Sequence, residues 1–331
     1  MGLKFILLLL IGGLLAGCSV IVDRRASERE AEAERAFPPE GRFVTVEGQR
    51  VHAVVRGSGP DLVLIHGLSG NLRDFTFSMV DRLAERYRVI AFDRPGLGYS
   101  DPLPADANTL VDQARVLSQA AAELGAPRPL VLGQSYGGAV ALAWATTQPE
   151  SYSGLVLVSA VSQTWPDGLP FFYKVTSSTL GAKLAVPLIT AFVSDGTVEN
   201  ALAEVFEPQT APDGYSEHIG AGLTLRRETM RANADQRAGL KSEVEALVPF
   251  YPRIARPVEI VHGTADRIVG PNVHAVPLSQ QIPDAGLTLL PGIGHMPHHV
   301  AQDAVVEAID RAAGRVAGTR GAQRRRPALQ R

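Results

Sequence analysis

Short apolar runs alternate with longer amphipathic stretches over most of this chain. The runs are rich in Val, Ile and Leu, so each predicts a buried strand; they lie at 61–65, 88–92, 129–132, 154–158, 257–261 and 287–290. Apolar residues at helical spacing predict helices at 75–86, 109–124, 138–145, 272–281 and 302–316. Strands that alternate with helices predict an α/β fold, in which helices cover both faces of a mostly parallel sheet.

Two regions depart from this alternation. Residues 43–46 and 51–55 predict an antiparallel hairpin that turns through Glu47 and Gly48. Between residues 159 and 251 the strands stop; 170–175 and 180–193 are strongly apolar, and 199–205 and 220–234 have a helical pattern. The aromatic residues of this insertion either line an apolar substrate site or form its own small core; they are Phe171, Phe172, Tyr173 and Phe192.

The most informative segment runs from Gly133 through Ser135 to Gly137. It has the pattern Gly-x-Ser-x-Gly and lies between the predicted strand 129–132 and the predicted helix 138–145. A strand, a tight turn and a helix form the context of a nucleophile elbow, which holds a serine hydroxyl above the edge of the sheet. Asp266 and His295 follow two later strands, and active sites of parallel sheets lie at the carboxyl ends of their strands.

Those three residues can perform nucleophilic catalysis. A serine hydroxyl is a weak nucleophile at neutral pH and needs a base within hydrogen-bonding reach. His295 can take the proton of Ser135 and later return it to the leaving group. Asp266 would fix the tautomer of the imidazole and stabilise the imidazolium. The order Ser, Asp, His along the chain is that of the α/β-hydrolases.

From residue 43 to residue 316 the chain resembles the α/β-hydrolase fold family, in its serine-nucleophile branch. The matching segments are 66–70, 93–100, 133–138, 262–266 and 294–295. The resemblance implies an oxyanion hole made by the backbone N–H groups of Leu68 and Tyr136, and it implies that the insertion is a helical cap. It also implies that His66 shapes the oxyanion loop and that Asp93 and Arg94 form a structural turn.

Some assignments stay open at this stage. Family members sometimes place the acid after an earlier strand, where Asp167 is the nearest candidate. A metal site at His295, His298 and His299 is disfavoured because the sequence shows no acidic or cysteine residue beside them.

We expect a serine hydrolase that acts on small carboxylic esters with a fairly apolar body and needs no cofactor or metal. Serine in place of aspartate argues against the haloalkane dehalogenase and epoxide hydrolase branches. The alternatives are a carbon–carbon bond hydrolase, a cofactor-free haloperoxidase or perhydrolase, and a proline-iminopeptidase-like peptidase. A non-catalytic binding protein on the same fold is a further alternative.

The N-terminus resembles a bacterial lipoprotein signal. Lys4 precedes the apolar run 5–15, which is too short to span a bilayer, and a small-residue site follows that ends at Cys18. The resemblance implies removal of residues 1–17 and a lipid on Cys18; the alternative is an ordinary secretory signal. Cys18 is the only cysteine, so an intramolecular disulfide is impossible. We expect a protein anchored to a membrane of the cell envelope, and Ser19 favours the outer membrane where there are two.

The composition of the chain limits the size of its core and the kinds of partner it can have. A hydrophobic content of 45% supports a sizeable core, and a net charge of −2 gives no sign of a nucleic-acid partner. No obligate protein partner can be inferred. The predicted organisation is a charged linker at 18–40, a core at 41–160, a cap at 161–251, the rest of the core at 252–316 and a disordered basic tail at 317–331. Residues 23–36 of the linker are expected to be either solvated or a short exposed helix.

Overall fold

The structure, a computed structural model, describes residues 2–104 and 107–324, with side chains for 17–104 and 107–318. Within these residues one sheet has the strand order β1-β2-β4-β3-β5-β6-β7-β8. Its strands are β1 (Arg42–Val46), β2 (Gln49–Arg56), β3 (Asp61–Ile65), β4 (Arg88–Phe92), β5 (Leu130–Gln134), β6 (Gly154–Val158), β7 (Val258–Gly263) and β8 (Gly286–Leu290).

Strands β3 to β8 are parallel, whereas β2 runs antiparallel to both β1 and β4. The predicted hairpin is confirmed: Val46 pairs with Gln49, and both turn residues, Glu47 and Gly48, have positive φ. Turns of this kind match the twist of two antiparallel strands. The α/β architecture expected from the sequence is therefore present.

Each face of the sheet is covered by helices. In β3, Val63 and Ile65 pack into one apolar cluster, and Leu62 and Leu64 pack into the cluster on the opposite face, as the two-residue period of a strand requires. Helices α4 (Leu110–Glu123), α5 (Tyr136–Thr147) and α12 (Ala275–Gln281) cover the first face. Helices α2 (Arg73–Thr76), α3 (Met79–Ala84) and α14 (Gln302–Arg324) cover the second.

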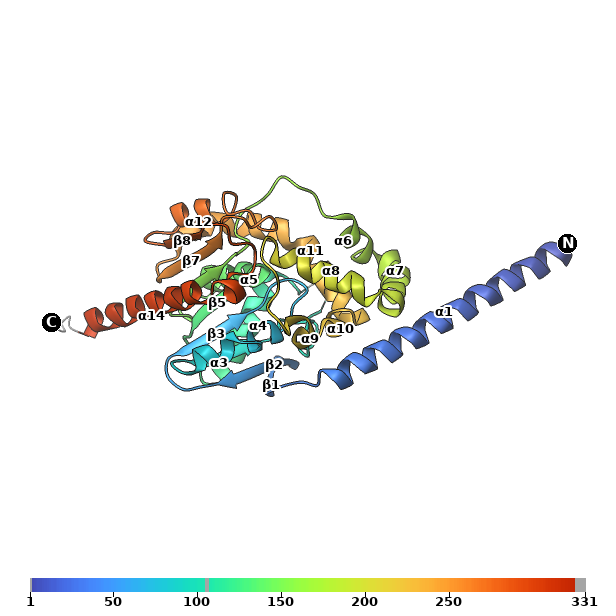
Figure 1. The fold of residues 1–331 in the computed structure, drawn as a ribbon, viewed down its shortest axis with the longest axis horizontal. Helices are drawn as coiled ribbons and strands as arrows, with labels where there is room; N and C mark the ends of the chain where they lie inside the picture. The colour runs from blue at the N-terminus through green and yellow to red at the C-terminus, as the bar shows by residue number, and fades with distance from the viewer. Residues whose placement is uncertain (1, 105–106, 325–331) are drawn as a thin grey trace.

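The insertion consists of helices that gather at one end of the sheet (Figure 1). They are α6 (Phe171–Thr176), α7 (Thr179–Phe192), α8 (Asp195–Phe206), α9 (Tyr215–Ile219), α10 (Ala221–Thr224) and α11 (Arg227–Leu247), followed by the 3-10 helix η1 (Val248–Arg253). We call α6 to α11 the cap.

Two predicted helices are each divided. The helix expected at 75–86 is split between α2 and α3, because Ser78 leaves the helical region and its hydroxyl accepts a hydrogen bond from Gln302. The helix expected at 220–234 is split between α10 and α11, because Arg226 is extended. The sequence of a short segment carries no information about contacts with residues far away in the chain.

Of the two alternatives for the charged segment, the helix is present, but it is part of one long helix, α1 (Gly2–Ala36), which packs against the cap and is not fully exposed. Ala26 is fully buried there, and Arg25 donates a hydrogen bond of 2.8 Å to the carbonyl of Ala191. The dense mixture of charges favours a helix through pairs four residues apart, such as Arg24 with Glu28. The acidic residues of α1 also form ion pairs with arginines of the cap.

Helices α1 and α14 extend from opposite sides of the molecule (Figure 1). Helix α14 continues to Arg324, so the first part of the expected disordered tail is helical, and 325–331 lie outside the described residues. Within the part of the chain that the structure describes, no helix has both the length and the apolar character to cross a membrane.

Candidate active site

Ser135 occupies a strained turn at the carboxyl end of β5. Its φ and ψ are 53° and −117°, a conformation that non-glycine residues rarely adopt, and α5 begins at the next residue. Gly137 permits this crossing, because a Cβ there would lie 2.6 Å from the carbonyl oxygen of His66 and closer still to that of Ile65. The local geometry is that of the elbow predicted from the sequence.

Asp266 and His295 form a buried pair at the ends of β7 and β8. The Nδ1–H of His295 donates to Oδ2 of Asp266 at 2.8 Å, and Oδ1 accepts from the backbone N–H groups of Ile268 and Val269 at 2.9 Å each. Burial opposes ionisation of Asp266, but hydrogen bonds from His262 and His295 outweigh it and lower the pKa of this carboxyl. The carboxylate therefore binds the imidazole through Nδ1 and leaves Nε2 as the nitrogen that can take a proton.

The pair lies close to the carboxyl end of β5. The side-chain amide of Gln134, the residue before Ser135, lies 3.4 Å from Nε2 of His295. Asp167, the alternative acid, is exposed and forms no ion pair with a histidine among the described residues. His295 therefore lies next to the residue that precedes Ser135, and its acidic partner is Asp266 and not Asp167.

Two backbone amides next to the serine have no partner. Neither Leu68 N–H nor Tyr136 N–H donates a hydrogen bond to any other described residue. Gly67, just before Leu68, is so close that a Cβ on it would lie 3.2 Å from Cβ of Ser135. Both donors are therefore available for an oxyanion that forms on a substrate.

Comparison with known proteins agrees with this geometry. A family model described as alpha/beta hydrolase fold matches residues 60–302. The chain belongs to the alpha/beta hydrolase fold family. Its relatives include the 2-hydroxymuconate semialdehyde hydrolase of Pseudomonas putida, 30% identical over 80% of this chain and 90% of that protein.

Solved structures agree with the fold of this hydrolase. An alpha/beta hydrolase fold protein from Burkholderia ambifaria is 27% identical, with a TM-score of 0.66 over 82% of this chain and 98% of that one. The esterase RhEst1 from Rhodococcus sp. ECU1013 is 24% identical, with a TM-score of 0.62 over 82% and 97% of the two chains.

Arg94 binds the backbone of the loop that carries the N–H of Leu68. It is fully buried and donates to the carbonyl oxygens of His66 and Gly67 at 3.0 Å each, and its guanidinium lies 4.2 Å from the ring centroid of Tyr136. Burial lowers the pKa of Arg94 to about 10, so it remains charged at neutral pH. Arg94 thus contacts both segments that carry the free amides.

Two further bonds connect Arg94 to the rest of the fold. Its Nη1 donates to Gln113 of α4 at 2.9 Å and to Gln236 of the cap helix α11 at 2.6 Å. The sequence marks Arg94 only as a residue of a structural turn. The missed signal was an arginine two residues after a buried strand, at a position where burial of its charge is costly unless several acceptors bind it.

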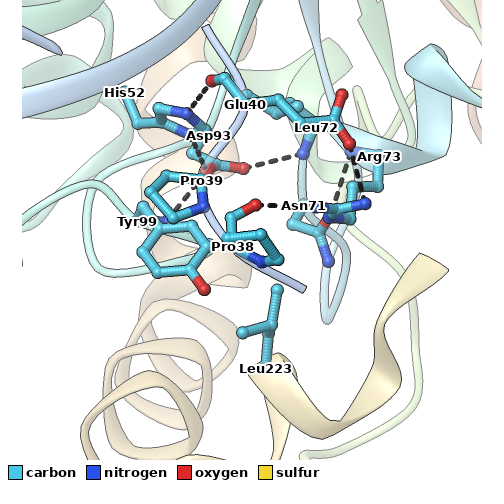
Figure 2. Close-up of a pocket in the computed structure, with 11 residues that line it drawn as sticks. Pro38, Pro39, Glu40, His52, Asn71, Leu72, Arg73, Asp93, Tyr99 and Leu223 are labelled. Atoms are coloured by element: carbon cyan, nitrogen blue, oxygen red, sulfur yellow. Dashed lines mark hydrogen bonds and ion pairs between the residues drawn. The ribbon is translucent and has the colours of Figure 1, made fainter. Parts of the chain in front are cut away.

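The adjacent turn is held by Asp93, as the resemblance implied. Its carboxylate accepts from the N–H groups of Leu72 and Tyr99 at 2.7 and 2.8 Å and from Nδ1 of His52 at 2.7 Å. Figure 2 shows these bonds converging beneath a small pocket where Pro38 to Glu40, the segment after α1, lies on the core.

His298 and His299 do have an acidic neighbour, contrary to the reading of the sequence. Both donate through Nε2 to Asp74, at 3.0 and 2.8 Å, and the hydroxyl of Tyr215 donates to the same carboxylate at 2.8 Å. Burial opposes ionisation of Asp74, but the two histidines outweigh it and hold its pKa well below the usual range. These three potential metal ligands lie within 4.8 Å of one another. Both carboxylate oxygens already accept hydrogen bonds, and the bond from Tyr215 joins the cap to the core.

Proposed function

We propose that this protein is a serine hydrolase that cleaves carboxylic esters of fairly apolar substrates. One observation carries the proposal: the buried Asp266–His295 pair, with its 2.8 Å hydrogen bond, lies at the same sheet edge as Ser135 and two unpartnered amides. This arrangement supplies a nucleophile, a base and an oxyanion site without further groups.

The reaction would proceed through an acyl-enzyme. Oγ of Ser135 attacks the ester carbonyl while Nε2 of His295 takes its proton, and the oxyanion is stabilised by the N–H groups of Leu68 and Tyr136. The C–O bond to the alcohol breaks as His295 protonates the leaving oxygen. A water, deprotonated by the same imidazole, then releases the acid and restores Ser135.

The test is hydrolysis of p-nitrophenyl esters from acetate to palmitate by the chain that lacks residues 1–17, with Ser135→Ala beside it. A fluorophosphonate label is applied to both proteins. Turnover and labelling that vanish together in the variant would support the proposal. A folded protein that shows neither would overturn it and favour a binding role.

One relative favours a second candidate. The similarity to a 2-hydroxymuconate semialdehyde hydrolase makes a non-ester substrate, cleaved by the same Ser135, the main alternative. Labelling of Ser135 without turnover of any ester in the series would select this alternative, or the peroxidase and peptidase chemistries.

We further propose that the mature protein is anchored to an envelope membrane through a lipid on Cys18. Cys18 lies in helix α1 and is exposed, as an attachment point must be. In a bacterial host, Cys18→Ser should yield an uncleaved or soluble protein. Unchanged membrane fractionation of this variant would contradict the anchor.

A further inference from the structure

Three of the four aromatic residues whose role the sequence leaves open, Phe171, Phe172 and Phe192, are exposed on the cap, and Tyr173 is half-buried. Phe171 is 79% exposed and Phe192 is 51% exposed, so neither lines a pocket nor forms a core. Three leucines of α7 are also exposed: Leu180, Leu184 and Leu188. We call the exposed side chains Phe171, Phe172, Leu180, Leu184, Leu188 and Phe192 the apolar stripe.

The exposed apolar side chains of α7 lie on one face of the helix and are not scattered around it. Along α7 they recur every fourth residue from Leu180 to Phe192, which places them on one side of the helix. The opposite side of α7, with Val186 and Thr190, is buried against the protein. A contiguous apolar surface of this kind marks a contact with a partner or a membrane.

The charges around the stripe fit a lipid surface. From residue 168 to residue 194 the sequence contains no carboxylate, and its only charged residues are Lys174 and Lys183, both exposed. Apolar side chains flanked by lysines suit an interface with anionic headgroups.

Helix α1 places the proposed lipid anchor beside the stripe. Its Arg25 lies 4.9 Å from the ring centroid of Phe192, and Arg29 donates to the carbonyl of Val193 at 2.6 Å. Val20 and Ile21, in the turns before this contact, are 66% and 64% exposed. Figure 1 shows α1 passing α7 and continuing beyond the body of the protein.

The distance from the anchor to the docked part of α1 is short. Cys18 and Arg25 belong to the same helix, whose rise of about 1.5 Å per residue separates them by roughly 10 Å along the axis. A lipid on Cys18 therefore holds the cap at the membrane surface, with no flexible spacer between them.

We propose that the apolar stripe, together with Val20 and Ile21, rests in the headgroup region of the membrane that holds the anchor. This inference rests on the proposed attachment at Cys18. It assigns the outer face of the cap to lipid, and it implies that the hydrolase receives esters that partition into the bilayer.

The test uses the full lipidated protein with one probe at a time. Because the thiol of Cys18 is consumed by the lipid, Leu184→Cys supplies a single free thiol for the polarity-sensitive dye NBD. Leu289→Cys, at a comparably exposed position on the edge strand β8, is the matched control. Both proteins are placed in phosphatidylethanolamine–phosphatidylglycerol vesicles and exposed to iodide.

We expect a blue-shifted emission and protection from iodide at position 184 in vesicles, relative to the unlipidated Cys18→Ser chain without residues 1–17 in buffer, and neither effect at position 289. A probe at 184 that stays fully quenched in vesicles would overturn the proposal. Protection of the unlipidated chain in buffer that grows with protein concentration would show that a second copy covers the stripe instead. Protein that does not float with the vesicles would overturn docking together with the anchor.

A second variant separates docking from catalysis. Leu184→Glu with Leu188→Glu changes only exposed side chains, so it should abolish the blue shift of a probe at Leu180 and leave flotation unchanged. Hydrolysis of soluble p-nitrophenyl acetate should also stay unchanged. If no protein of the series hydrolyses a soluble ester while the probe at position 184 is still blue-shifted in vesicles, the proposed function is overturned and the docking is not.

Discussion

Glu30 of helix α1 accepts three hydrogen bonds from Arg227 of the cap. The backbone N–H and Nε of Arg227 lie 2.8 and 2.9 Å from Oε1, and Nη2 lies 2.7 Å from Oε2. Burial opposes ionisation of Glu30, but these bonds outweigh it and lower its pKa. An arginine that binds both oxygens of a carboxylate fixes the orientation of the two groups as well as their distance. The pair therefore holds helix α1 in one orientation on the cap.

Glu30→Gln should therefore loosen helix α1. Glutamine keeps one acceptor oxygen, so we expect a net loss of about 1.5 kcal/mol, the lower value for a hydrogen bond to a charged group, and roughly tenfold faster amide exchange between residues 23 and 36. Hydrogen exchange measured by mass spectrometry checks this. Glu32→Gln, an exposed neighbour, is the control and should leave exchange unchanged. Equal effects of the two variants would show that the Arg227 pair does not hold the helix.

Asp266→Asn should lower kcat for a soluble ester by about 10⁴-fold while Ser135 still reacts slowly with a fluorophosphonate. The amide no longer stabilises the imidazolium of His295, although it keeps the size of the carboxylate. Steady-state kinetics with p-nitrophenyl acetate measure the loss. Asp167→Asn is the matched variant, and a larger effect there than at Asp266 would reassign the acid.

Arg94→Lys should lower kcat more than it raises KM. Lysine keeps the charge but cannot serve four acceptors, so the Gly67 loop shifts and the oxyanion amides lose alignment. We expect a loss of kcat of roughly tenfold or more and a fall of about 2–3 kcal/mol in the free energy of unfolding. Arg128→Lys, at an exposed position, is the control. An unchanged kcat in a destabilised Arg94 variant would mean that Arg94 is purely structural.

Gly137→Ala should destabilise the fold by about 3 kcal/mol or more, because the added Cβ would collide with the backbone between β3 and the oxyanion loop. Gly196→Ala is the matched change in α8, where nothing lies within 4 Å of the new Cβ, and it should be neutral or stabilising by about 0.5–1 kcal/mol. Urea denaturation of both variants measures the difference. Equal stability of the two would show that the elbow tolerates a wider crossing.

The free energy of unfolding should fall as the pH drops from about 6.5 to about 4. His66 and His274 each accept backbone N–H donors through a ring nitrogen, so both are neutral in the fold. Burial, with a smaller contribution from neighbouring positive charge, lowers the pKa of each from 6.5 to about 4. The unfolded chain takes up these protons first, so each histidine costs the folded state up to roughly 3 kcal/mol across this window.

Urea denaturation at intervals from pH 7 to pH 4.5 measures this slope. His274→Gln retains an acceptor for the N–H groups of Ser162 and Gln163 but cannot be protonated, so its slope should be shallower. A slope that is identical in the variant would exclude His274 as a source of the pH dependence.

The sequence determined the order of strands and helices, the turn at Ser135 and the place of Asp266 and His295 after their strands. These follow from local periodicity and from the rule that parallel strands end at one edge of a sheet, so they needed no knowledge of distant contacts. The division of the predicted helix 75–86 at Ser78 was not readable, because its cause is a hydrogen bond from Gln302.

Only the tertiary structure decided which charges and apolar groups meet. The pattern around Glu30 is that of a solvated segment, and it becomes a docked helix because Arg227 lies nearly two hundred residues away in the chain and beside it in space. Likewise Asp74 could not be assigned to His298 and His299 from spacing. From the sequence Phe192 either lines a substrate site or belongs to the core of the cap, yet it is exposed, because α7 buries its other face. Periodicity is a property of neighbours along the chain, whereas burial and ion pairing depend on which surfaces the fold brings together.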